Sequence, residues 1–241
     1  GETMDTIAAT ELLKENGAHV LALVNVVGSS LARMADIVFY LHVGPEIGVA
    51  STKAYLGMLV GQLLLAKHWD SANKLDVSFD EIAELPKLIE QTMACEKQIK
   101  DISEKIYKKN DIYFIGRGLD YALAAEGALK LKEISYLHAE ALAAGELKHG
   151  TLALIEDGTP IIVTASQNHL LDKTTSNVQE VIARGAYVIA IGDNQSEKLE
   201  NISDEYVTLP DSNEFLTTVI SIIPLQFIAY HVANLNGESI D

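Results

Sequence analysis

Cysteine is almost absent from this sequence, with Cys95 the single one among 241 residues. A lone cysteine cannot form an intramolecular disulfide, so a disulfide-stapled scaffold is excluded, and the composition is consistent with a reducing compartment. The 5 prolines and 16 glycines are also too few for a collagen-like or low-complexity chain. Because 48% of the residues are hydrophobic, the chain can bury a sizeable core, and its length predicts one or two globular domains.

Positive charge is scarce as well, since 18 Lys and Arg face 34 Asp and Glu, which gives a net charge of −16. Nucleic acids and anionic membranes are bound mainly through Lys and Arg, so neither is an expected partner. A small anionic ligand is still compatible with this charge, because backbone N–H groups at a helix start can hold a phosphate. No signal peptide opens the chain, and polar residues interrupt the apolar stretches before about 18 positions. We therefore expect a soluble, cytoplasmic protein.

Strand and helix patterns alternate along the chain, which predicts an α/β fold. Most of the expected strands are apolar throughout, as is typical of parallel strands buried on both faces. The expected strands are 19–25, 37–43, 111–116, 159–164, 186–193 and 206–209. The expected helices are 4–16, 51–69, 79–109, 120–137, 170–184 and 214–234.

An internal repeat at an offset of 168 residues divides the chain into two α/β units. Residues 17–22 (GAHVLA) align with 185–190 (GAYVIA), Leu31 with Leu199, and Asp36 with Asp204. We predict a first domain at 1–75, a helical connector at 76–110 and a second domain at 111–241. The repeat leaves roughly 55–60 residues of the first unit unmatched, so we expect a fragment that lacks the N-terminal part of its first domain. The alternative is that the first unit is simply a half-domain.

The predicted helix 120–137 carries three charged residues on one face. At 100° per residue, Glu126, Lys130 and Glu133 fall within an arc of about 60°, which they share with large apolar residues. One interpretation is an ordinary solvated ion pair between positions i and i+4. The other is a cleft in which a carboxylate with a raised pKa lies beside a lysine and removes a proton next to a carbonyl.

Three further segments carry candidate binding residues. His149 ends a Glu-Leu-Lys-His stretch between glycines, and a histidine side chain can act as an acid or a base, although a loop histidine is often incidental. Ser51 or Thr52 could simply cap the helix that follows, or the free N–H groups there could bind an anion or a sugar hydroxyl, and residues 1–3 have the same ambiguity. The run 116–118 (GRG) follows an expected strand and hints at phosphate, but it lacks the third glycine of a dinucleotide fingerprint. No Cys/His cluster has metal-ligand spacing, so we predict neither a metal nor a cofactor.

Taken together, these motifs resemble the isomerase half of the glutamine–fructose-6-phosphate aminotransferases, which is built from two sugar-isomerase (SIS) domains. The resemblance covers essentially the whole chain. It rests on GETMDT, EIGVASTKA, GRG, QFIAYHVANLNG and above all the 25-residue run 126–150, EGALKLKEISYLHAEALAAGELKHG. It implies two three-layer α/β/α domains with parallel sheets, and a site at the carboxyl ends of strands.

The resemblance also implies an activity: fructose 6-phosphate and ammonia yield glucosamine 6-phosphate, and a glutaminase domain elsewhere in the parent chain supplies the ammonia. Glu133 then matches the residue that moves a proton between C1 and C2, with Lys130 assisting and Glu126 beside them. His149 matches the ring-opening histidine, which the family contributes from the neighbouring subunit, so a homodimer is implied.

Substrate-binding positions follow from the same resemblance. Thr3 matches the last residue of a Ser-Gln-Ser-Gly-Glu-Thr phosphate loop, while Val49 and Ser51 match sugar-contacting positions. The Ser-Gln-Ser half of that loop and the imine-forming lysine of the family's C-terminal tail have no match, and 166–168 (SQN) is a degenerate echo of the loop. We therefore expect no synthesis of glucosamine 6-phosphate by these 241 residues alone. A phosphosugar isomerase or deglycase, and a non-catalytic sugar-phosphate sensor, remain alternatives.

Overall fold

A computed structural model describes residues 1–240, and the chain divides into a first unit, Gly1–Asp76, and a second unit that begins at Val77. The first unit contains α1 (Met4–Glu15), β1 (Leu21–Val24), α2 (Ser30–Met34), β2 (Ile37–Tyr40) and α3 (Lys53–Trp69). Strands β1 and β2 pair in parallel, with Leu21 opposite Ile37 and Val24 opposite Tyr40.

The second unit contains a five-stranded sheet in the order β4-β3-β5-β6-β7, and every pairing in it is parallel. Its strands are β3 (Asp111–Gly116), β4 (His138–Ala143), β5 (Pro160–Ala165), β6 (Tyr187–Gly192) and β7 (Glu205–Thr208). Its α-helices are α4 (Phe79–Ala83), α5 (Leu85–Met93), α6 (Glu96–Ile106), α7 (Leu119–Ser135), α8 (Leu171–Ile182), α9 (Glu197–Ile202), α10 (Glu214–Ile220) and α11 (Ile222–Asn236). Short 3-10 turns are η1 (Ala144–His149), η2 (Thr151–Leu154) and η3 (Asn168–Leu170). The prediction of an α/β fold with parallel sheets is confirmed.

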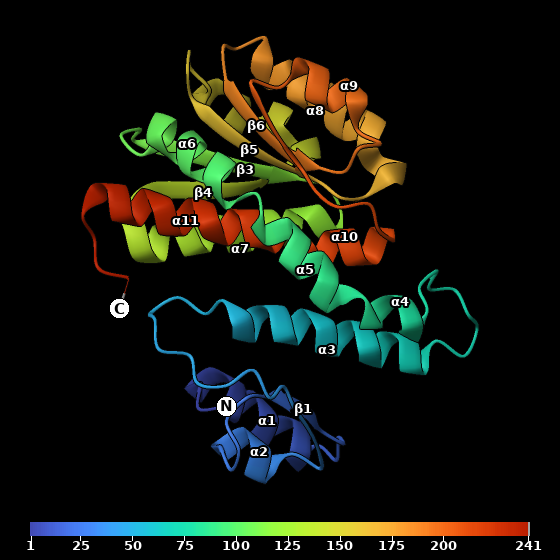
Figure 1. The fold of residues 1–241 in the computed structure, drawn as a ribbon. Coiled ribbons are helices and arrows are strands. Elements are labelled where there is room, and N and C mark those ends of the chain that lie inside the picture. The colour runs from blue at the N-terminus through green and yellow to red at the C-terminus, as the bar shows by residue number, and fades with distance from the viewer. Residues whose placement is uncertain (241) are drawn as a thin grey trace. The chain divides into compact units, whose positions relative to one another are not determined.

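Helices cover both faces of this sheet (Figure 1). Helices α6, α7 and α11 pack together on one face, and α8 and α9 lie on the other. Alternate residues of β3 pack against opposite helix layers: Tyr113 and Ile115 belong to the core cluster under α8, while Phe114 faces Gly127 of α7. The strands are therefore apolar throughout because both of their faces are buried.

The repeat seen in the sequence has a structural counterpart in each unit. In the first, the Asp36 carboxylate accepts the Val20 N–H at 2.8 Å and the Asp36 N–H donates to the Val20 carbonyl. In the second, Asp204 and Val188 make the same two bonds, again with 2.8 Å at the carboxylate. An aspartate thus fixes the start of the last strand in both units.

Several elements differ from the sequence prediction. The predicted helix 79–109 is divided into α4, α5 and α6, with Pro86 in the first turn of α5. The segment 138–143, for which the sequence analysis expected no strand, is the edge strand β4; its three alanines favour helix locally, and pairing with β3 overrides that preference. Within the described residues, α2 and α9 are also short helices that no periodicity had indicated.

One helical run in the described part of the chain, Glu214–Asn236, is long and apolar enough to cross a membrane by length and composition. The sequence analysis had not identified a run of this kind. Of its most apolar window, 78% is buried inside the protein. Leu225, Ile228 and Val232 are among its completely buried side chains, so the run supplies core to the second unit.

Candidate functional site

The three charged residues of α7 lie together. The Lys130 ammonium nitrogen is 2.6 Å from Glu133 Oε2 and 3.4 Å from Glu126 Oε1. The Lys130 side chain is only 5% exposed, whereas that of Glu133 is 35% exposed. The sequence interpretation as a solvated surface pair is therefore wrong for Lys130, which is buried between two carboxylates.

Electrostatics distinguishes the two carboxylates. Burial raises the pKa of Glu126 above its ordinary value; the Lys130 ammonium opposes that rise, and the negative charge of Glu133 adds to it. Glu133 lies at the solvent boundary and accepts the short hydrogen bond from Lys130. Glu126 thus neutralises the buried Lys130 ammonium from the protein interior, while Glu133 contacts the ammonium and can also reach a ligand.

Close packing of α7 fixes the position of this cluster. Gly127 lies where an added Cβ would be 3.0 Å from Phe114 Cε1 and 3.1 Å from Leu225 Cδ1, so a larger residue would require these side chains of β3 and α11 to shift. The helix ends at Tyr136, which adopts a left-handed conformation with φ 58°. Because α7 runs from the end of β3 back to the start of β4, Glu133 lies toward the amino end of these strands. Glu133 therefore does not lie at the carboxyl ends of the strands in its own unit, where the site was expected.

His149 is placed far from Glu133 along the same chain. It ends η1, which follows the carboxyl end of β4, whereas Glu133 precedes the amino end of that strand. A strand of six residues spans roughly 17–20 Å, so the two side chains do not meet within one chain. The His149 side chain is 75% exposed, and its Nε2 lies 4.0 Å from Glu146 Oε2.

In the first unit, the carboxyl ends of β1 and β2 border a hollow, and the predicted residues Thr3, Val49 and Ser51 are not among those that line it. This hollow, of about 410 Å³, is lined by Asn25, Val26, His42, Gly44 and Pro45. The Asn25 side chain joins the two strand ends, because its amide donates to the Gly44 carbonyl at 2.6 Å and its oxygen accepts the Val43 N–H at 3.1 Å.

Val49 and Ser51 lie in the loop between β2 and α3, and Glu46 shapes that loop. Its carboxylate accepts the N–H and the hydroxyl of Thr52 at 3.2 and 2.9 Å, and the Ala54 N–H at 2.9 Å. Burial raises the pKa of Glu46, but these hydrogen bonds outweigh burial and leave the pKa lowered. Sequence reasoning had assigned the cap to Ser51 or Thr52. The helix start is instead capped by a carboxylate several residues upstream, a spacing that no standard capping motif describes.

Thr3 is the N-cap residue of α1, and its side chain makes no capping hydrogen bond. The neighbouring Glu2 carboxylate is directed to α2, where it accepts the Ser30 N–H at 2.9 Å. The hydroxyl of Thr3 and the first N–H groups of α1 are thus available to an anion.

Arg117, in the GRG run, has a structural contact. Its Nη1 donates to Asn177 Oδ1 at 2.8 Å, and its guanidinium lies over Gly145, where an added Cβ would be 3.0 Å away. Arg117 therefore links the end of β3 to η1 and α8.

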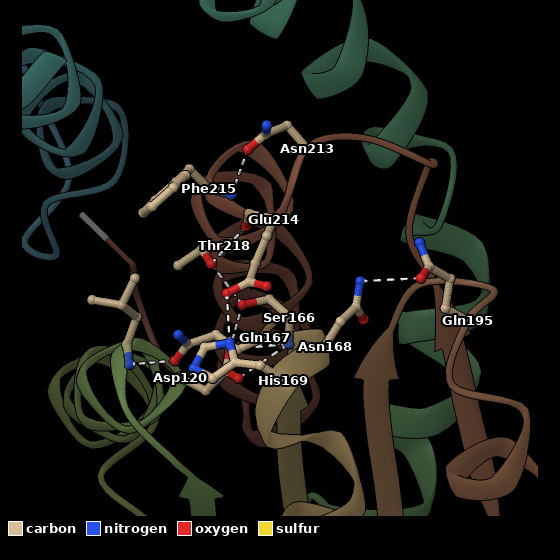
Figure 2. A network of polar contacts seen from close by, with 11 residues as sticks. Asp120, Ser166, Gln167, Asn168, His169, Gln195, Asn213, Glu214, Phe215 and Thr218 are labelled. Carbon is tan, nitrogen blue, oxygen red and sulfur yellow. Dashed lines mark hydrogen bonds and ion pairs between the residues drawn. The ribbon is translucent and has the colours of Figure 1, made fainter. Parts of the chain in front are cut away.

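Sequence reasoning also missed a buried polar network at the carboxyl end of β5, centred on Asp120 and Ser166 (Figure 2). Asp120 follows the GRG run closely, but nothing in its spacing to Ser166 signals a contact. Among residues 1–240, no group of three or more His, Cys, Asp or Glu side chains is arranged to hold a metal ion.

Comparison with known proteins places these features in a family. The SIS domain model matches residues 1–67 and 105–235. This chain belongs to the SIS domain family. It is 46% identical, over all of its length, to the glutamine–fructose-6-phosphate aminotransferase [isomerizing] of Thermococcus kodakarensis, and it covers 41% of that protein. The similarity identifies the matching part as the SIS-domain isomerase portion of that enzyme.

Solved structures agree with this assignment. The C-terminal domain of glucosamine-fructose-6-phosphate aminotransferase from Francisella tularensis is 40% identical, with a TM-score of 0.89, and the match covers 100% of this chain and 70% of that one. A glucosamine-6-phosphate deaminase from Thermotoga maritima is 23% identical, with a TM-score of 0.76 over 100% of this SIS chain and 69% of its own, which shows a shared fold alone. The chain spans about two fifths of the length of the curated relatives it matches.

Proposed function

We propose that this chain is the isomerase portion of a glutamine-dependent glucosamine-6-phosphate synthase, which converts fructose 6-phosphate and ammonia to glucosamine 6-phosphate in the cytoplasm. A glutaminase domain of the parent protein releases the ammonia. The observation that carries the proposal is the Glu126–Lys130–Glu133 cluster: a buried lysine between two carboxylates, on a segment matched in relatives of this activity.

Glu133 moves the proton in this proposal. Isomerisation of a ketose imine to an aldose removes a proton from one of C1 and C2 and returns it to the other, through an enolamine-like intermediate. A single carboxylate can act first as base and then as acid, provided that it is accessible to the sugar and held in place. Glu133 meets both conditions, because its side chain is partly exposed and accepts a hydrogen bond from Lys130.

Lys130 and Glu126 support that transfer. A buried ammonium 2.6 Å from Glu133 holds this carboxylate in place and supplies a positive charge next to the developing negative charge on the sugar. Glu126, half-buried on the preceding turn, pairs with Lys130 at 3.4 Å and orients it. We assign Glu126 as a substrate-binding neighbour through this pair.

His149 opens the sugar ring in this proposal, acting across the interface of a homodimer. The separation of His149 from Glu133 along β4 supports a contribution from the partner, since one chain does not bring the two together. Its high exposure is that of a side chain free to enter a neighbouring subunit's site.

Thr3, Val49 and Ser51 bind the phosphosugar. Thr3 and the N–H groups of α1 hold the phosphate, which reconciles an anionic substrate with a net charge of −16. Val49, 67% exposed, and Ser51 contact the sugar from the loop that Glu46 shapes. We also propose the division into a first SIS domain at 1–75, a helical connector at 76–110 and a second SIS domain at 111–241.

The test is sugar-phosphate turnover by the full-length protein, with glutamine and with ammonia as nitrogen donors. We expect glucosamine 6-phosphate in both assays, and His149→Ala is expected to slow the reaction more with cyclic than with open-chain sugar. Equal slowing with both forms would remove the ring-opening role. Isomerisation without incorporation of nitrogen would identify a phosphosugar isomerase or deglycase. Binding with no turnover at all would identify a sugar-phosphate sensor.

A further inference from the structure

A buried carboxylate occupies the junction between β5 and α8 in the second unit (Figure 2). Asp120, in the first turn of α7, is only 1% exposed. Both of its carboxylate oxygens lie 3.1 Å from the Ser166 N, and Oδ1 accepts the Ser166 hydroxyl at 2.6 Å. The hydrogen-bond donors of Ser166, the residue that follows β5, are thus both directed at the Asp120 carboxylate.

The surroundings hold this carboxylate in a fixed position. The Thr164 hydroxyl donates to the Asp120 carbonyl at 2.9 Å, and the Leu119 N–H donates to Gln167 Oε1 at 2.6 Å. On its other side, the Ser166 hydroxyl lies 2.7 Å from Thr218 Oγ1. The end of β5 and the loop after it are therefore hydrogen-bonded to the start of α7 on one side and to α10 on the other.

The donors to Asp120 are neutral. Burial raises its pKa to about 6, the hydroxyl and N–H of Ser166 and the N–H of Gln167 lower it, and the negative charge of Glu214 adds to the rise. Main-chain N–H groups and a hydroxyl at the end of a parallel strand, just before a helix, are the donors with which α/β folds bind phosphate oxygens.

The first unit offers a contrast at the aligned position. At the offset of 168, Gly1 and Thr3 align with His169 and Leu171, so the start of α1 corresponds to the start of α8. The Thr3 side chain is not engaged in capping, and the nearby Glu2 carboxylate is directed to Ser30. At the corresponding junction in the second unit, the Asp120 carboxylate accepts the Ser166 hydroxyl.

The Ser166 N–H and hydroxyl and the Gln167 N–H form an anion seat between β5 and α8. We propose that the Asp120 carboxylate is a built-in substitute for a ligand's phosphate: it fills this seat, so that the junction in the second unit does not bind the phosphate of a phosphosugar. The statement about phosphosugar rests on the proposed function, whereas the occupied seat rests on the contacts of Asp120 alone.

The experiment compares Asp120→Ala with Asp120→Asn in the full-length protein at neutral pH. The alanine variant vacates the seat, and the asparagine variant keeps an oxygen acceptor in it. Two probes are used: formate, which matches the removed carboxylate, and inorganic phosphate. Hydrogen exchange of the backbone amides of Ser166 and Gln167 reports on the seat directly, and equilibrium binding counts phosphate sites per chain.

We expect both anions to slow exchange of these amides in Asp120→Ala, by about tenfold at ten times the dissociation constant, and to leave the wild type and Asp120→Asn unaffected. Phosphate sites are expected to rise from one to two per chain in the alanine variant. If that variant does not fold in chloride, recovery of folding by formate and phosphate is the readout.

If neither anion slowed exchange of these amides, the proposal would be overturned. If formate slowed it and phosphate did not, the claim that Asp120 keeps phosphosugar out of this junction would be overturned. If the wild type bound no phosphosugar at all, the proposed function would be refuted instead, so the two failures can be told apart.

Discussion

The Lys130 ammonium bridges two carboxylates of unequal exposure, with Glu133 at 2.6 Å and Glu126 at 3.4 Å. Pairs of titratable groups whose environments separate their pKa values are a recurrent way of dividing acid and base roles. Here the half-buried Glu126 has a raised pKa, and the more exposed Glu133 is the one that a substrate can reach. The arrangement requires all three residues, so each has a distinct expected effect on substitution.

Lys130→Met is expected to destabilise the second unit by about 2–4 kcal/mol, because it leaves Glu126 half-buried without its counter-charge. Urea unfolding of the full-length protein measures the loss. The matched control is Lys130→Met combined with Glu126→Gln, which removes the unpaired charge and is expected to recover part of the stability. A double variant less stable than Lys130→Met would contradict a buried ion pair.

Glu46→Ala is expected to loosen the first turn of α3 by about 1–2 kcal/mol, since the N–H groups of Thr52 and Ala54 lose their acceptor. Hydrogen exchange of residues 52–57 is the direct measurement, with Glu46→Gln as a control that keeps one acceptor oxygen. If exchange in the alanine variant matched that of the wild type, the carboxylate would not be the cap.

Stability in the acid range tests the environment of Asp120. Its folded-state pKa of about 6 lies above the ordinary 3.8, so the folded state binds the proton more tightly and this group favours folding at low pH. Its contribution is lost as pH rises from about 4 to about 6, by about 3 kcal/mol for a shift of this size. The stability of the wild type relative to Asp120→Asn should fall over that range. A constant difference between pH 3.5 and 7 would show that Asp120 has no raised pKa.

Gly127→Ala tests the packing that positions the cluster. Alanine gains about 1 kcal/mol in helix propensity, but its Cβ must displace Phe114 and Leu225, which costs about 1–3 kcal/mol. We expect a net loss in urea unfolding, whereas Ala125→Gly, on the exposed side of the same helix, loses only its propensity. An alanine variant more stable than the wild type would mean that α7 has room at this position.

Elements with a strong apolar pattern could be predicted from the sequence. The strand 111–116 was predicted with its observed bounds, and the other buried strands within a few residues, because both faces of a parallel sheet demand apolar side chains. Strand β4 was missed because alanine occupies every second position in it and alanine does not favour a strand. This edge strand forms because it pairs with β3. The divisions between α4, α5 and α6 were missed because helical periodicity continues across them.

The candidate site was predictable in part. Periodicity alone placed Glu126, Lys130 and Glu133 on one face, and the structure brings them into contact. Periodicity could not reveal that Lys130 is buried, since that depends on how α7 packs. The roles of Glu46 and Asp120 depend on contacts between segments distant in sequence or unusual in spacing, which a sequence pattern does not encode.

Glu133→Gln tests the account most directly. The variant keeps the side-chain volume but cannot take up a proton, so the full-length protein should still bind fructose 6-phosphate while proton transfer falls by about 10²–10⁴-fold. The measurement is exchange of the C1 and C2 hydrogens of the sugar phosphate with deuterated water, followed by NMR. Retained binding with lost exchange is the predicted result, and exchange at the wild-type rate would contradict Glu133 as the group that moves the proton.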